Sequence, residues 1–92
     1  MTRLEREFWQ YHHDHPDVYD ALRRLALDAI ERRGYTHMGI AALWEILRWE
    51  RRLDMTDGVF KANNNYRAYY ARLLMEREPQ LVGFFRLREV AA

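Results

Sequence analysis

Two residue types are missing from this chain of 92 residues, cysteine and serine. Without cysteine there is no disulfide, no thiolate metal site and no thiol nucleophile. Without serine there is no serine-based catalytic triad. A Gly-rich phosphate loop and an HExxH motif are also missing. We therefore expect no enzymatic activity and no cofactor, and the cytoplasm is the expected compartment.

Long apolar runs are missing as well. No stretch approaches the roughly 18–20 residues that a membrane helix needs, and the charged start MTRLEREFWQ does not resemble a secretory signal. We predict no membrane partner. A hydrophobic fraction of 49% excludes a disordered chain, and the length suits one core. The prediction is a single all-α domain over residues 1–92, a compact bundle of four to five helices.

Charge is nearly balanced, with a formal net charge of +1. Arginine supplies all the basic residues except Lys61. Arginine suits bidentate contacts to phosphate or guanine, although codon usage in a GC-rich genome is the simpler explanation. The first twenty residues are acidic and residues 59–78 are more basic, so the chain is mildly polarised.

Local signals define the first two helices. Thr2 and Glu5 form a capping-box pattern, and the first helix should end within residues 12–15. Pro16 suits the first turn of a second helix, and Gly34 suits its C-terminal end. The apolar stripe of this second helix consists of Val18, Leu22, Leu25, Ala26, Ala29 and Ile30.

Two further helices are predicted at residues 40–52 and from about residue 66 to 77. The third should bury Ile40, Leu43, Trp44, Ile46 and Leu47, with Trp49 off this stripe. The fourth should be capped by one of three asparagines and bury Tyr66, Tyr69, Tyr70, Leu73 and Leu74. Pro79 should then open a short last helix with Leu81, Val82, Phe84, Phe85 and Leu87 buried. Residues 53–62 fit a β-hairpin wing, a loop or a short extended segment near residues 59–61.

The start of the fourth helix is the leading candidate site. A helix N-terminus attracts phosphate, asparagine reads adenine and arginine reads guanine. The predicted nucleic-acid-binding residues are Lys61, Asn63, Asn64, Asn65, Arg67 and Arg72. Ala68 and Ala71 are expected on the same face. Such a pattern more commonly belongs to an ordinary solvent-exposed helix that begins with an asparagine cap and binds no nucleic acid.

The order of the helices predicts that helices two to four form a helix-turn-helix-like unit that binds DNA, as in a phage or bacterial transcriptional regulator, either alone or as a homodimer. The long connection over residues 53–62 departs from the usual turn of about 3–4 residues. The alternative is a protein–protein interaction module, such as a small adaptor or an anti-defence inhibitor. Its interface anchors would be Trp9, Trp49 and Phe85.

Histidines gather at the junction of the first two helices, at positions 12, 13 and 15. Imidazoles three residues apart on a helix can share a metal ion. Pro16 disfavours a helical His15, however, and no complete ligand set emerges. We predict surface histidines and no metal.

The segment from residue 60 to 88 carries the motif FKxNNNYxxYYARL, followed by Pro79, Phe84-Phe85 and Arg88. In this motif the chain resembles a family of small bacterial and phage proteins. The resemblance implies a bacterial or phage setting. It brings no activity and no functional residue with it.

Overall fold

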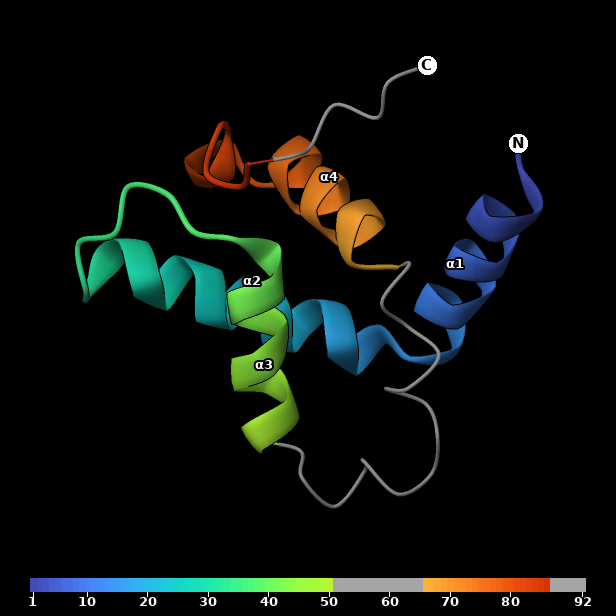
Figure 1. Cartoon of the computed structure of the whole chain (residues 1–92), viewed down its shortest axis with the longest axis horizontal. Helices are drawn as coiled ribbons and strands as arrows, with labels where there is room; N and C mark the ends of the chain where they lie inside the picture. Colours follow the sequence, from blue (N-terminus) through green and yellow to red (C-terminus); the bar gives the residue numbers. More distant parts are fainter. Residues whose placement is uncertain (51–65, 87–92) are drawn as a thin grey trace.

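The computed structural model describes residues 1–50 and 66–86 as a bundle of helices (Figure 1). Its elements are α1 (Arg3–Asp14), α2 (Pro16–Glu31), α3 (Ile40–Glu50), α4 (Arg67–Arg77) and a 3-10 turn, η3 (Pro79–Leu81). The predicted all-α fold is confirmed. The proposed extended segment near residues 59–61, the end of the third helix beyond Glu50, and Leu87 lie outside the described residues.

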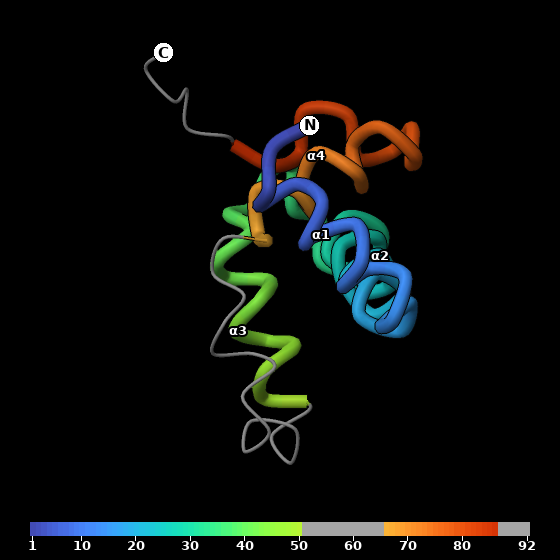
Figure 2. The backbone as a smooth tube through the Cα atoms, turned by 90° about the vertical axis from the view of Figure 1, so that its right-hand side faces the viewer, coloured from blue at the N-terminus to red at the C-terminus, as the bar shows by residue number. Residues whose placement is uncertain are grey.

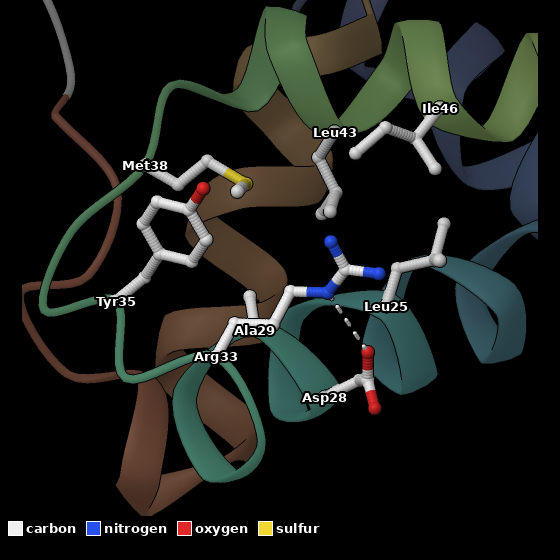
Figure 3. Close-up of a pocket in the computed structure, with 8 residues that line it drawn as sticks. All are labelled: Leu25, Asp28, Ala29, Arg33, Tyr35, Met38, Leu43 and Ile46. Atoms are coloured by element: carbon white, nitrogen blue, oxygen red, sulfur yellow. Dashed lines mark ion pairs between the residues drawn. The ribbon is translucent and has the colours of Figure 1, made fainter.

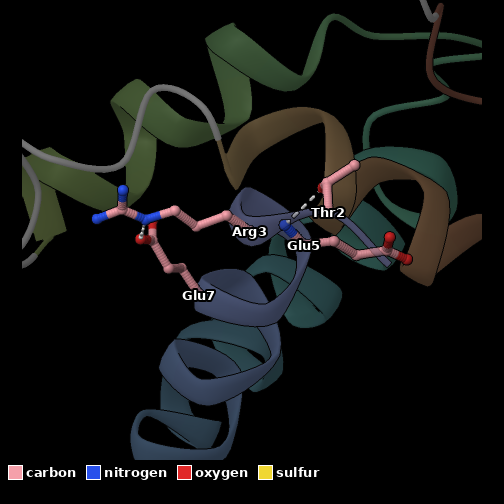
Figure 4. Close-up of polar contacts among 4 residues, drawn as sticks. All are labelled: Thr2, Arg3, Glu5 and Glu7. Atoms are coloured by element: carbon pink, nitrogen blue, oxygen red, sulfur yellow. Dashed lines mark hydrogen bonds and ion pairs between the residues drawn. The ribbon is translucent and has the colours of Figure 1, made fainter.

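The ends of α1 and the start of α2 follow the sequence signals. The side-chain oxygen of Thr2 accepts a hydrogen bond of 3.1 Å from the backbone N–H of Glu5, and Arg3 pairs with Glu7 at 3.0 Å one turn along (Figure 4). His15 ends α1 and precedes Pro16, the first residue of α2. The predicted cap and the predicted helix junction are therefore confirmed.

Gly34 turns the chain from α2 toward α3. Its φ of +71° lies in the left-handed region, which a residue with a Cβ adopts at a cost of about 1–2 kcal/mol. Beyond the turn, the backbone N–H of Met38 donates to the carbonyl of Phe84 at 3.0 Å. This bond ties the segment before α3 to the segment after α4.

The core lies where α2, α3 and α4 meet, with α1 added at one side. Phe8 of α1, Leu22 of α2, Trp44 of α3 and Tyr70 of α4 are almost completely buried. α3 crosses α2 steeply (Figure 1), and Figure 2 shows its C-terminal end extending away from the other three helices. One side of α3 therefore packs on the core while the other side is not covered by α1, α2 or α4.

Several burial predictions are wrong. Ile46 and Val82 were expected in the core but are 41% and 74% exposed. Ala71 was expected on an exposed face and is fully buried. Phe85 is 4% exposed, which confirms its predicted burial and contradicts its prediction as an exposed interface anchor. The reasons lie in the packing of α3 and α4 and in the turn at Gly83.

The ends of α4 also differ from the prediction. Tyr66 occupies the N-cap position and makes no side-chain capping bond, so none of the three asparagines is the N-cap of α4. After α4, Pro79 opens a single 3-10 turn rather than a longer helix. Across the described parts of the chain, no helix is both long and apolar enough to span a membrane.

Candidate functional site

The most unusual element is α3, the most apolar of the described helices. Eight of its eleven residues are apolar. Leu43, Trp44 and Leu47 face the core and are buried. The opposite side carries four exposed apolar residues, which we call the outer face of α3: Ala41, Ala42, Ile46 and Trp49. So apolar a helix is normally covered on most of its sides.

The outer face of α3 presents two large side chains to solvent. Trp49 is 75% exposed and Ile46 is 41% exposed. Single exposed apolar residues are ordinary on protein surfaces, but neighbouring ones on one face mark interaction sites. The two side chains lie three positions apart on one helix and are therefore neighbours.

The charged residues of α3, on and beside this face, are all in ion pairs. Glu45 accepts from Arg48 at 3.1 Å, and Glu50 accepts from Arg24 of α2 at 2.8 Å. Each carboxylate of α3 thus has an arginine beside it. Among the described residues, the charges beside the outer face nearly cancel, which suits contact with a protein better than contact with a polyanion.

A pocket of about 220 Å³ adjoins the outer face between α2 and α3 (Figure 3). Ile46 belongs to both surfaces, so the pocket continues the outer face toward α2. Asp28 at its margin pairs with Arg32 at 3.3 Å and with Arg33 at 3.7 Å. The lining residues are Leu25, Asp28, Ala29, Arg33, Tyr35, Met38, Leu43 and Ile46.

A second, shallower groove lies between α1 and α4. Trp9 is 36% exposed there and packs edge-on against Phe8, with ring centroids 5.2 Å apart. The guanidinium of Arg72 lies 5.8 Å from the centre of the Tyr69 ring. The residues of this groove are Glu5, Phe8, Trp9, Tyr69, Arg72, Leu73 and Glu76. Trp9 is thus partly covered within the fold, in contrast to Trp49.

Of the six predicted nucleic-acid-binding residues, Lys61, Asn63, Asn64 and Asn65 lie outside the described residues. Arg67 and Arg72 lie on α4, where five positions correspond to a rotation of about 140°. Arg67 is half-buried on the side of α4 that carries buried Ala71, whereas Arg72 is exposed in the groove with Glu5 and Glu76. The structure does not bring these two arginines to one surface.

The histidines do not form a metal site in the described parts of the chain. His12 stacks on Phe8, with centroids 6.1 Å apart and planes 6° apart, and its ring meets Tyr19 edge-on at 5.4 Å. Burial and the nearby Arg77 guanidinium lower the pKa of His12. This imidazole is therefore part of the aromatic packing between α1, α2 and α4, while His13 is exposed.

Sequence reasoning found Trp49 and missed the rest of the outer face. The signal that could have found it is the composition of residues 40–50, in which only three positions are charged and the apolar residues extend beyond one stripe. Trp9 is exposed in part, as an interface anchor requires, and the predicted burial of Trp44 is confirmed at 1% exposure.

No match was found when the chain was compared with protein-family models, with curated proteins and with solved structures. The resemblance to small bacterial and phage proteins stays a prediction.

Proposed function

We propose that this protein is a protein–protein interaction module that binds its partner through the outer face of α3. The observation that carries the proposal is the 75% exposure of Trp49 on the most apolar of the described helices. Tryptophan is among the residue types enriched in the side chains that dominate binding energy. An adaptor or inhibitor without catalytic activity fits such a surface.

The neighbourhood of Trp49 supports this proposal. Ile46 extends the apolar surface into the pocket beside α2, so a partner can bury a continuous patch. The Glu45–Arg48 and Arg24–Glu50 pairs lie around the patch. Polar margins around an apolar centre are the usual anatomy of a protein interface.

We expect a double variant, Ile46→Glu with Trp49→Glu, to lose the partner. Two carboxylates in the centre of an apolar interface would be buried unpaired, which costs several kcal/mol. The measurement is affinity capture, in which each variant is used as bait in a lysate of the organism that carries its gene and each retained protein is quantified. Val82→Glu is the matched control, because Val82 is 74% exposed and lies beyond α4.

The proposal requires a protein that the wild type and the Val82→Glu variant retain and the double variant loses. Equal retention by all three would show that the outer face of α3 is not the interface. Both variants replace exposed side chains, so folding should be preserved, and circular dichroism verifies it.

DNA binding stays a prediction, and the described residues favour the protein interface over it. Arg72 is accompanied by Glu5 and Glu76 in its groove, so the local field is weak for a phosphate backbone. We expect no steeply salt-dependent affinity for a mixed-sequence duplex in a fluorescence-anisotropy salt series. Tight binding that weakens with salt, and that Arg72→Ala reduces, would instead make nucleic acid the ligand and α4 the surface.

A further inference from the structure

The outer face of α3 has a size gradient along the helix. Ala42 and Trp49 lie seven positions apart, so they share one stripe with an offset of about 20°. The small residue lies near the N-terminal end of α3 and the large one near the C-terminal end. A partner that matches this surface must offer a large side chain over Ala42 and a small one under Trp49.

A second copy of α3 in the antiparallel direction offers this match. A two-fold axis that passes between Glu45 and Ile46 would place each Trp49 over Ala42 of the other copy. The same surface then serves both partners, as an isologous interface requires. Alanines at 41 and 42 would let the two helix backbones approach to within the usual 8–10 Å between helix axes.

The charges permit this contact. Near the proposed axis, Glu45 already pairs with Arg48 of its own chain at 3.1 Å, and Glu50 pairs with Arg24 at 2.8 Å. Two copies therefore meet with neutralised carboxylates instead of repelling each other. With a net charge of +1 per chain, the overall repulsion between copies is also small.

We propose that the partner of the outer face of α3 is a second copy of this chain, held by antiparallel packing of α3 against α3 with Trp49 over the other copy's Ala42. This inference rests on the proposed function and names its partner. It makes Trp49 the central anchor of a two-fold symmetric dimer.

Sedimentation velocity over a concentration series tests the dimer, with four variants beside the wild type. Trp49→Ala removes two anchors per dimer and should raise the dissociation constant at least about 30-fold. Ala42→Trp alone should weaken the dimer by collision of two indoles. The double variant Ala42→Trp with Trp49→Ala exchanges large and small and should recover dimerisation. Val82→Ala, away from α3, should have no effect.

A cysteine-free chain also permits a direct test of the axis. Ile46→Cys places one thiol near the proposed axis, so mild oxidation should give a covalent dimer rapidly. Val82→Cys is the control and should cross-link no faster than a random collision allows.

A wild type that is monomeric at every concentration would overturn the inference. A dimer that Trp49→Ala and Ala42→Trp leave intact, or that the exchanged variant fails to recover, would also overturn it. The capture experiment is independent of this test. If the wild type is monomeric and the double glutamate variant at Ile46 and Trp49 loses a different protein, the proposed function stands and the dimer inference is wrong. Failure of both experiments would remove both.

Discussion

Replacing Trp44 by alanine is expected to lower the free energy of unfolding by about 3–5 kcal/mol. The side chain of Trp44 is 1% exposed, and the centroid of its ring lies 5.8 Å from the ring centroid of Tyr70 in α4. Alanine would leave a cavity where α2 and α4 both contact α3. A domain of this kind has a total stability of about 5–15 kcal/mol, so the variant would lose a large share of it.

Urea denaturation followed by circular dichroism measures the effect of Trp44→Ala, and α3 supplies its own control. Trp49→Ala removes the same side chain from the same helix at a position that is 75% exposed. At concentrations where the chain is monomeric, this variant should change the free energy of unfolding by no more than about 0.5 kcal/mol. Similar losses in the two variants would contradict the assignment of Trp44 to the core and Trp49 to the surface.

The sequence could predict the parts of the fold that local chemistry determines. Thr2 caps α1, Pro16 begins α2 and Gly34 reverses the chain after it, because each residue type has a specific backbone role. These roles depend on a few neighbouring residues, so they survive without knowledge of the tertiary structure. Trp44 and Trp49 were separated correctly because five positions turn a helix by about 140°.

The direction in which Ile46 points could not be predicted. Periodicity identifies a buried face when the rest of the helix is polar, and only three of the eleven residues of α3 are charged. Which apolar side is covered then depends on α2 and α4, which reach Leu43 and Leu47 and leave Ile46 at the edge. The apolar character of α3 made the predicted burial of Ile46 wrong, and the proposed interface depends on the same property.

The burial of Phe85 and the exposure of Val82 depend on a turn that the sequence analysis did not predict. A continued helix would have buried one side of residues 79–87. Instead, Gly83 has a φ of +74°, and the chain after η3 lies against the segment before α3, with an isolated bridge between Met38 and Phe85. This turn buries Phe84 and Phe85 together and leaves Val82 exposed.

On α4, the helical wheel placed the tyrosines at the centre of the buried stripe and Ala71 outside it. The structure shifts the stripe, so that Tyr66 and Tyr69 are half-buried at its margins and Ala71 is fully buried. Tyrosine tolerates a margin because its ring can be covered while its hydroxyl reaches water. Alanine carries too little hydrophobic signal to reveal its own burial from sequence.

Ala71→Arg therefore provides the sharpest test of how α4 is oriented. Ala71 has no exposed surface, so an arginine there must be buried without a partner or must push α4 away. Burial of an unpaired charge together with overpacking should lower the free energy of unfolding by about 4 kcal/mol or more. Ala71→Leu adds volume without charge and should cost about 1–3 kcal/mol, which keeps the test measurable if the arginine variant does not fold.

The control for Ala71→Arg is Ala41→Arg, the same substitution at an exposed position of α3. At concentrations where the chain is monomeric, we expect this control to unfold within about 0.5 kcal/mol of the wild type, since surface substitutions rarely do more. Urea denaturation compares all three variants. If α4 instead presented Ala71 outward as a DNA-reading helix does, both Ala71 variants would be as stable as the control. The added arginine would then strengthen duplex binding, because a further cation would lie beside the phosphates.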